Sequence, residues 1–477
     1  MMKTAFLILV LLSNLVSASE PINIESRREL FIDDFLIESL ENAEIRLSTP
    51  RDEGPVHKFD KSWEGPFCGY STIIKDGGRY LLYYRGLPKS GKDGSEDETT
   101  CIITSTDGIN WTRPELSNFL KKKYPRNNII LANAAPVTHN FSPFLDTNPN
   151  VIPNQKFKAL GGTEKSGLIA YSSEDGFHWK KLAENAVFKD GIFDSQNVSF
   201  WSEHEKCYVC YFRTWTGGGY SGYRSVSRTT SKDFFNWTIP TKMNFGDTPS
   251  EHLYTNQTHP YFRAPQIYIG IAARFMPGRR ILSKDEAKII GVNQSYFNDC
   301  SDVVILSSRG GNSYKRKFME SFLRPGIGLE NWVSRSNYPA LNIVQTSSHE
   351  MSFYVNQNYA QSSSCLHRYS LRIDGISSIY AGFRKGTVIT KPFIFKGKQL
   401  HMNYSTSAAG GIKVSILDNS KSPYKSFDIG NAIESIGNYI DRIIKWKNIN
   451  DLSSLEGKIV RLKIELKDAN LYSLRFN

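Results

Sequence analysis

Helical periodicity is almost absent from this sequence of 477 residues, and its absence argues against helix bundles and other helix-rich folds. Beyond the N-terminal segment, no stretch approaches the roughly 20 apolar residues that a membrane span requires. The formal net charge is +12, yet the basic residues form no run longer than Lys121–Lys123. Charge dispersed in this way is typical of solvated surface, so we expect neither a nucleic-acid partner nor a membrane span.

Cysteine is also scarce, with six residues in the whole chain. An even number permits disulfides in an exported protein but does not establish them. Cys207 and Cys210 look like a metal-binding or redox pair, but they lie in the expected strand KCYVCYF, where residues three apart face opposite sides. We therefore interpret them as buried thiols and expect no zinc site.

The first 18 residues have the pattern of a cleavable signal peptide. Lys3 supplies the positive start, 5–16 forms the apolar segment, and Val16-Ser17-Ala18 is a site of small residues. We predict cleavage after Ala18 and a secreted or periplasmic protein.

One short pattern, Ser-x-Asp-Gly-x-x-Trp, occurs four times in strict or looser form, at intervals of 68, 58 and 77 residues. The copies are STDGINW from Ser105, SEDGFHW from Ser173, SKDFFNW from Ser231 and SRGGNSY from Ser308. Apolar or alternating residues typical of a strand lead into them. The Asp-Gly pair permits a tight turn, and the aromatic residue folds back over apolar surface. A single copy would be an ordinary hairpin turn, but four copies predict the radially repeated sheets of a β-propeller.

The chain divides into five strand-rich blocks and a C-terminal region of different character. We expect the segment around Phe31, Asp33 and Phe35 to be a strand that closes the ring by pairing with the last blade. From Gly375 onward, short alternating strands without the turn pattern, such as GIKVSIL and IVRLKIEL, predict a β-sandwich. The predicted fold is therefore all-β, with a signal peptide at 1–18, a five-bladed propeller at 19–373 and a β-sandwich at 374–477.

A five-bladed propeller followed by a β-sandwich resembles glycoside hydrolase family 32, with relatives in families 43, 68 and 117. More closely, RELFIDDFLIE, WEGPFCGYSTIIKDGGRYLLYYRG, FDSQNVSFW and ENWVSRSNYP resemble a group of uncharacterised bacterial proteins described as family 32-like. The Trp-x-Asn-Asp-Pro-Asn-Gly signature of family 32 and its Arg-Asp-Pro motif are both missing. The resemblance thus implies an architecture and a carbohydrate-processing class, with no site residue matched to a family motif.

Candidate catalytic residues follow from the fold, because the inner strands of a propeller contribute side chains to a shared axial funnel. We expect one carboxylate for each blade at its first strand: Glu64, Asp146, Asp194, Glu251 and Glu330. Glycosidases use two carboxyl groups, one as proton donor and one ionised as nucleophile or base. Crowded like charges separate the pKa values of such a pair.

Among these carboxylates, three are predicted to be catalytic. Asp194 lies in FDSQN among small and amide side chains, and is the first choice. Glu251, next to His252 and near Tyr254, is the candidate acid. Asp146 is the third, as stabiliser or base. A purely structural interpretation also applies to each, because Asp residues cap turns and a lone Glu is usually solvated.

Sugar binding calls for aromatic platforms and planar polar groups near the same strands. The predicted substrate-binding residues are Glu64, His139, Asn140, Gln196, Asn197, Tyr254, Asn256, Trp332, Arg335 and Asn337. Arg263 and Arg335 could bind the carboxylate or sulfate of an acidic sugar, although Arg263 fits better as a structural partner of a carboxylate.

The resulting hypothesis is an exported glycoside hydrolase-like protein that cleaves an oligo- or polysaccharide. Acidic and sulfated saccharides are among the candidate substrates. A non-catalytic, lectin-like propeller is the alternative, and a scaffold or adhesion module is a third option. We expect a monomer or simple homo-oligomer and no organic cofactor. The axial carboxylates are also compatible with a structural calcium ion, although no contiguous calcium loop is present.

Overall fold

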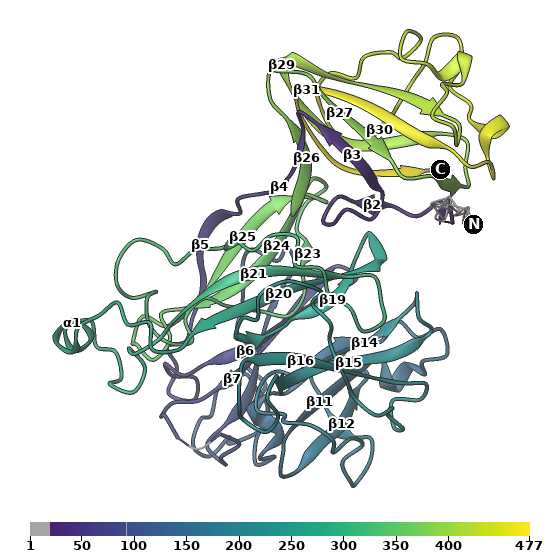
Figure 1. Ribbon diagram of the computed structural model, residues 1–477. Coiled ribbons are helices and arrows are strands. Elements are labelled where there is room, and N and C mark those ends of the chain that lie inside the picture. The colour runs from purple at the N-terminus through teal and green to yellow at the C-terminus, as the bar shows by residue number, and fades with distance from the viewer. Residues whose placement is uncertain (1–19, 92) are drawn as a thin grey trace, which may run out of the picture.

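The computed structural model describes residues 20–91 and 93–477. Within them the chain is nearly all β, with one short helix, α1 (Lys284–Ile289), on a projecting loop (Figure 1). Single 3-10 turns occur at Val137–His139, Pro153–Gln155, Lys425–Phe427 and Ser453–Leu455. No helix of this part of the chain is long and apolar enough to cross a membrane. The predicted signal peptide and its cleavage after Ala18 lie outside the described residues.

Five antiparallel sheets form the lower unit in Figure 1, which confirms the predicted five-bladed propeller. The first blade comprises β6 (Gly69–Asp76), β7 (Arg79–Gly86), β8 (Thr99–Ser105) and β9 (Ile129–Leu131). The second comprises β10 (Ser142–Leu145), β11 (Phe157–Thr163), β12 (Gly167–Ser173) and β13 (Lys180–Lys181). The third comprises β14 (Val198–Ser202), β15 (Cys207–Trp215), β16 (Arg224–Ser231) and β17 (Thr241–Lys242).

The last two blades have an inner strand that is broken in two. In the fourth blade, the strands are β18 (Leu253–Thr255), β19 (Thr258–Tyr261), β20 (Ala264–Met276) and β21 (Cys300–Ser308). In the fifth, they are β22 (Tyr338–Pro339), β23 (Val344–Gln345), β24 (Glu350–Gln357), β25 (Cys365–Arg372) and β5 (Arg51–Lys58). Because β5 comes from the N-terminal part of the chain, its pairing with β25 closes the ring.

The prediction that residues 31–35 close the ring is wrong, because that segment lies between the two units of the protein. Its alternating side chains face both ways: Leu30 and Ile32 pack against the fourth and fifth blades, whereas Phe31 packs into the C-terminal unit. Asp33 pairs with Arg309 at 2.9 Å. The alternation that predicted a strand thus reflects burial between two cores.

The recurring Ser-x-Asp-Gly pattern marks the end of the third strand in four blades, at β8, β12, β16 and β21. In the first copy, the Ser105 hydroxyl accepts from the Gly108 amide at 2.9 Å, and Asp107 accepts from the amides of Ile109 and Asn110 at 2.7 and 2.8 Å. These bonds hold the pKa of Asp107 well below its usual range, although burial opposes them. The turn is therefore fixed locally, as the sequence predicts.

The aromatic residue of each turn packs on the preceding blade. Trp179 of the second blade lies 6.1 Å, between ring centroids, from Tyr83 of the first, and Trp111 of the first lies 5.6 Å from Tyr354 of the fifth. The Tyr83 hydroxyl also donates to the carbonyl of Gly176 at 3.0 Å. The pattern recurs because it joins one blade to the next.

The upper unit is the β-sandwich predicted at the C-terminus. Its strands are β26 (Ser377–Ala381), β27 (Gly386–Thr390), β28 (Phe393–Phe395), β29 (Leu400–Leu417), β30 (Asn438–Ile443) and β31 (Arg461–Phe476). Four N-terminal strands pair with them: β1 (Ile22–Glu25), β2 (Glu29–Leu30), β3 (Ile37–Glu41) and β4 (Glu44–Leu47). Figure 1 shows β3 beside β27. The division into domains at 19–373 and 374–477 stays a prediction, and the pairing shows that 22–47 contribute strands to the second unit.

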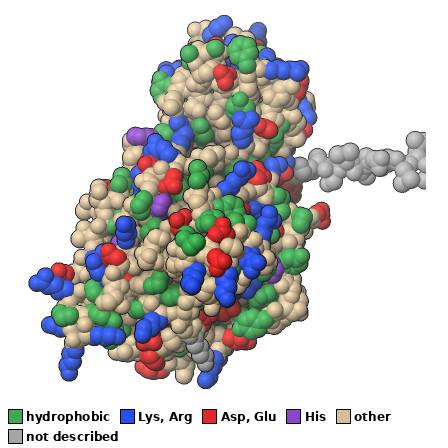
Figure 2. Space-filling view, turned by 90° about the vertical axis from the view of Figure 1, so that its left-hand side faces the viewer, with side chains coloured by type: hydrophobic (Ala, Val, Ile, Leu, Met, Phe, Trp, Pro, Cys, Tyr) green, Lys and Arg blue, Asp and Glu red, His purple; other side chains and the backbone are tan. Residues whose placement is uncertain are grey.

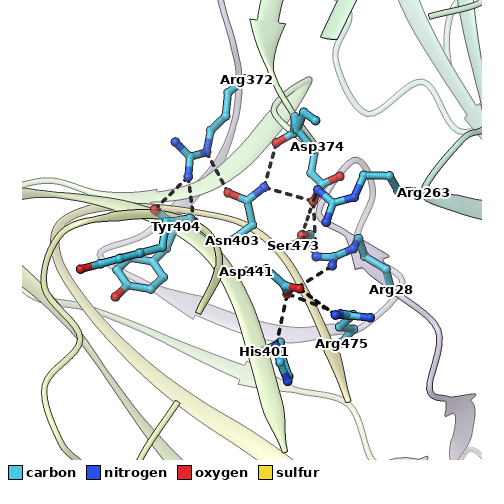
Figure 3. Close-up of polar contacts among 12 residues, drawn as sticks. Arg28, Arg263, Arg372, Asp374, His401, Asn403, Tyr404, Asp441, Ser473 and Arg475 are labelled. Carbon is cyan, nitrogen blue, oxygen red and sulfur yellow. Dashed lines mark hydrogen bonds and ion pairs between the residues drawn. The ribbon is translucent and has the colours of Figure 1, made fainter. Parts of the chain in front are cut away.

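A buried ion-pair network joins the two units (Figure 3). Asp374 accepts from Arg263 at 3.0 Å and from Ser473 at 2.6 Å, and it pairs with Arg28 at 3.4 Å. Because the Asp374 side chain is fully buried, these cations compensate its charge. Arg263 is therefore a structural partner of a carboxylate.

Basic and acidic side chains are interspersed over the face shown in Figure 2, in agreement with the dispersed charge of the sequence. All six cysteines are buried and unpaired. Burial raises the pKa of the Cys210 thiol to about 12 and also raises that of Cys207. Both behave as protonated thiols at neutral pH.

Candidate functional site

A layer of buried amides closes the propeller axis. The Gln196 amide donates to the Thr72 hydroxyl at 2.8 Å, and Gln257 donates to Gln196 at 2.6 Å and to the carbonyl of Pro339 at 2.8 Å. These four residues come from four different blades, so they meet where the inner strands converge. Gln196, predicted to bind substrate, thus forms a floor across the axis.

On one side of this floor, Asp194 is held by Arg213 of β15. The Arg213 Nε donates to Oδ1 of Asp194 at 2.7 Å, and Nη2 donates to the backbone carbonyl of Asp194 at 2.8 Å. The Arg213 side chain is 3% exposed and that of Asp194 is 27% exposed. The cation therefore lies beneath the carboxylate, whose outer edge reaches solvent.

Tyr254 of β18 lies at the centre of three arginines. Its ring centroid is 4.4 Å from the guanidinium carbon of Arg213, 5.3 Å from that of Arg224 and 5.7 Å from that of Arg335. Burial raises the pKa of Tyr254, but the charges of Arg335 and Arg213 outweigh it, and the net result is a lowered pKa. Cations this close to an aromatic face also stabilise its position.

Two of these arginines carry charge that no carboxylate balances. Within the described residues, neither Arg224 nor Arg335 is within ion-pair distance of an Asp or Glu. Both instead stack on rings, Arg224 at 4.5 Å from Trp215 and Arg335 at 5.2 Å from Tyr296. The site therefore has an excess of positive charge that suits an anionic ligand.

Arg335 lines a small cavity together with Tyr70, Arg85, Tyr338, Asn356 and Tyr359. Tyr70 and Arg335 both have positive φ, 52° and 62°, which is an unfavourable conformation for residues with long side chains. Positive φ also occurs at residues far from this cavity, among them Lys421 and Asn448 of the C-terminal unit, so it does not by itself mark the site.

Asn140 positions the loop that carries Asp194. Its side-chain amide donates to the carbonyls of Phe193 at 2.6 Å and Ser195 at 2.8 Å, on either side of Asp194. The Ser195 hydroxyl in turn donates to the carbonyl of Tyr254 at 2.7 Å. Asn140 is fully buried, so it holds the loop in position from behind and is not itself exposed to a substrate.

One group of side chains near the site could hold a metal ion: ligand atoms of Asp93, Glu98 and His139 lie within 4.8 Å of one another. However, Nδ1 of His139 already contacts Glu98 at 2.8 Å and Arg85 at 3.2 Å. A cation would have to share this space with the Arg85 guanidinium, which lies 3.8 Å from Glu98. The donor set is therefore better explained by the ion pair it already forms.

A glycine-rich loop between β15 and β16 carries aromatic side chains beside Asp194. Tyr220 is 58% exposed and Tyr223 is 45% exposed. The Tyr220 hydroxyl donates to Glu164 at 2.9 Å, which links the loops of two blades, and the charge of Asp194 helps to raise the pKa of Tyr220, after burial and the bond to Glu164. Exposed tyrosines in such a place can serve as sugar-stacking surfaces.

Glu251 is not brought into contact with Asp194. Arg274 donates to Glu251 at 2.8 Å and Arg316 donates to it at 2.7 Å, while Arg274 also pairs with Asp302 at 2.5 Å. This network lies within the fourth blade. The catalytic role of Glu251 stays a prediction.

Asp146 and Glu64 are buried in other ion-pair clusters. Asp146 follows its inner strand, whereas Asp194 precedes its own. Asp146 accepts hydrogen bonds from Lys158 and from the Tyr208 hydroxyl. Glu64 accepts from Arg113 at 2.9 Å, and its side chain is fully buried. Burial raises the pKa of Glu64, but hydrogen bonds from His57, Arg113 and Tyr84 outweigh it and lower the value to about 2.

The remaining predicted binding residues bond mainly to nearby backbone. The contacts are Asn197 to the Ser195 carbonyl at 3.1 Å, Asn256 to the Thr258 amide at 3.0 Å, Asn337 to the Ser301 carbonyl at 3.1 Å, and Trp332 to the Gly326 carbonyl at 3.2 Å. Of the predicted set, the structure thus brings together Asp194, Tyr254 and Arg335. Sequence reasoning missed Arg213 and Arg224, although both flank the glycine-rich run TGGGYSG.

No family model and no curated protein matches this sequence. Solved structures with a similar chain path include an N-acetylgalactosamine deacetylase from F. plautii, with 12% identity, coverage of 70% of this chain and 96% of the other, and a TM-score of 0.45. A β-1,2-mannobiose phosphorylase from Listeria innocua has 10% identity, coverage of 71% and 98%, and a TM-score of 0.46. A fructofuranosidase from Schwanniomyces occidentalis has 11% identity, coverage of 88% and 96%, and a TM-score of 0.37. These likenesses are too distant to assign a function.

Proposed function

We propose that this protein is an exported glycoside hydrolase-like enzyme that cleaves a saccharide bearing an anionic group, with Asp194 as its ionised carboxylate. The observation that carries the proposal is the cluster in which Arg213 touches both Asp194 and Tyr254, beside two arginines that have no carboxylate partner among the described residues. The resemblance of the sequence to family 32-like proteins agrees with this class.

Asp194 suits the role of nucleophile or of base for water. The Arg213 guanidinium binds its carboxylate and orients it. Glycosidases require one such ionised carboxylate next to the scissile bond, and the exposed edge of Asp194 leaves it accessible to a sugar carbon or a water molecule.

Arg224 and Arg335 suit the anionic group of the substrate. Guanidinium groups present paired donors that match a carboxylate or a sulfate. Because both guanidinium groups lie on the Tyr254 ring, an anion bound there would place its sugar ring next to Asp194.

A lectin-like protein is the second candidate, and one observation favours it. No second carboxyl group is in contact with Asp194 in the described part of the chain, whereas the arginine and tyrosine surface needs none to bind an anionic sugar. Binding without cleavage is what this alternative predicts.

The test is hydrolysis of oligosaccharides from plant and algal polysaccharides, in neutral, uronic-acid and sulfated sets, by the purified mature protein. The Asp194→Asn and Arg335→Ala variants are compared with Asp190→Asn, which alters an exposed carboxylate outside the cluster. We expect release of products from an anionic set only, lost in Asp194→Asn and weakened in Arg335→Ala. The same set carboxyl-reduced or desulfated should be a poor substrate.

Three results would count against the proposal. Cleavage of neutral sugars alone would remove the anion requirement, and activity retained in Asp194→Asn would remove the assigned carboxylate. Saturable binding without product release would establish the lectin-like alternative.

A further inference from the structure

The site of the proposed function, on which this inference rests, still lacks a proton donor. Cleavage of a glycosidic bond needs a group that protonates the leaving oxygen as well as an ionised carboxylate. Asp194 is bound by Arg213, and Glu251 is bound by Arg274 and Arg316. Asp194 is already assigned as nucleophile or base, and Arg274 and Arg316 occupy both oxygens of Glu251, so neither group is free to act as the donor.

Tyr254 lies close to Asp194. Its carbonyl accepts from the hydroxyl of Ser195, the residue after Asp194, at 2.7 Å. Arg213 contacts both residues, because it binds the Asp194 carboxylate and lies 4.4 Å from the Tyr254 ring. Among residues 20–91 and 93–477, the Tyr254 hydroxyl has no hydrogen-bond partner. It is also not one of the side-chain atoms that are fully buried without a partner.

The other tyrosines of the cluster are less suited to this role. The Tyr338 hydroxyl is buried without a partner, and burial raises the pKa of Tyr338 well above its usual value. Burial does the same to Tyr70, whose hydroxyl donates to the carbonyl of Asp194 at 3.3 Å. Tyr254 differs because, among the described residues, its hydroxyl neither donates to the Asp194 backbone, as Tyr70 does, nor lies fully buried without a partner, as that of Tyr338 does.

We infer that Tyr254 is the general acid of the reaction and acts together with Asp194. The Tyr254 hydroxyl gives its proton to the glycosidic oxygen as the bond from that oxygen to the anomeric carbon breaks, and the oxygen leaves as an alcohol. Asp194 supplies the electron pair that the anomeric carbon needs, either directly or through a water whose proton it accepts. Where Asp194 bonds directly, a water molecule later cleaves the ester and returns its proton to Tyr254.

The arginines explain why a phenol can act as the general acid. Loss of the proton leaves a phenolate, and a phenolate beside Arg213, Arg335 and Arg224 is stabilised by three positive charges. The same charges are present before the reaction and need not move, which makes their stabilisation effective in the transition state.

Leaving-group dependence tests the inference in Tyr254→Phe. The substrates are two aryl glycosides of the sugar that the wild type releases: a dinitrophenyl glycoside, whose leaving group needs no proton, and a phenyl glycoside, which does. We expect Tyr254→Phe to lower kcat on the phenyl glycoside by about 100-fold or more, and on the dinitrophenyl glycoside by less than about 10-fold. Tyr439→Phe, which alters a 40%-exposed tyrosine of the β-sandwich, should match the wild type.

A second measurement does not depend on activity. Ultraviolet titration of the folded protein should show one tyrosine that ionises below the ordinary value of about 10, and this transition should be lost in Tyr254→Phe but kept in Tyr439→Phe. Equal loss of rate on both glycosides, or a titration curve unchanged in Tyr254→Phe, would overturn the inference. A wild type that cleaves no member of the panel would overturn the proposed function, and the titration would then still report whether Tyr254 is the perturbed group.

Discussion

Arg213 binds Asp194 twice, through Nε to the carboxylate at 2.7 Å and through Nη2 to the backbone carbonyl at 2.8 Å. A guanidinium can make both contacts because its donors form a rigid fork, whereas the single ammonium of lysine cannot reproduce that geometry. The pair therefore fixes the direction of the carboxylate.

Arg213→Lys should keep the positive charge but no longer hold the Asp194 carboxylate in one orientation. Loss of one charge-assisted hydrogen bond costs about 1.5–3 kcal/mol, so we expect kcat to fall by roughly 10- to 100-fold while the protein stays folded. Steady-state kinetics measure the effect, and circular dichroism checks the fold. Wild-type kcat in a folded Arg213→Lys protein would show that the fork is unimportant.

Asn140→Ala should act through the loop that carries Asp194. The change removes the amide that binds the carbonyls of Phe193 and Ser195, which leaves buried acceptors without partners. Each such group costs about 1–3 kcal/mol, so urea unfolding should show a loss in that range or above it, together with a lower kcat. The exposed Asn118→Ala serves as the control, and equal unfolding curves for the two variants would contradict the assigned role.

Tyr83→Phe tests whether the recurring turn joins adjacent blades. The change removes only the hydroxyl that donates to the Gly176 carbonyl, at 3.0 Å across two blades. We expect the free energy of unfolding to fall by about 1 kcal/mol, measured by urea denaturation against Tyr439→Phe. If the two variants are equally stable, the contact contributes nothing to the ring.

Glu64→Gln should change the dependence of stability on pH. The folded pKa of Glu64 is about 2, against 4.5 ordinarily, so the ionised form stabilises the fold above about pH 4.5 and this contribution is lost as pH falls towards 2. The difference corresponds to about 3 kcal/mol. Glu64→Gln should be less stable than the wild type at pH 7, and the two should converge near pH 2.

Chemical denaturation at a series of pH values measures this convergence. Glu115→Gln, whose carboxylate is 65% exposed, should follow the wild type throughout. A constant difference between Glu64→Gln and the wild type from pH 7 to pH 2 would mean that the ionised state of Glu64 does not stabilise the fold.

The architecture could be predicted because its signals are local. Each Ser-x-Asp-Gly turn is held by bonds among residues that are close in sequence, as for Ser105 and Asp107, and alternation within strands needs only neighbouring residues. The closing strand was mistaken because β5, RDEGPVHK, is polar and half of its residues are exposed, whereas Leu30, Phe31 and Ile32 alternate between two cores.

The site was predicted only in part, because its partners come from distant strands. Asp194 and Tyr254 precede or begin inner strands, and that position alone indicated the funnel. Arg213 reaches it from a second strand, and whether a strand residue points to the axis depends on the register between blades. For the same reason, Lys158 beside Asp146 could not be foreseen, and that carboxylate was expected to face the axis.

The decisive measurement is the structure of the Asp194→Asn protein bound to an anionic oligosaccharide from the panel. The account predicts a sugar ring next to residue 194 and the Tyr254 hydroxyl, with its carboxylate or sulfate on the guanidinium of Arg335. An oligosaccharide bound to the β-sandwich, or one seated in the funnel with its anionic group away from Arg335 and its glycosidic oxygen out of reach of Tyr254, would contradict it.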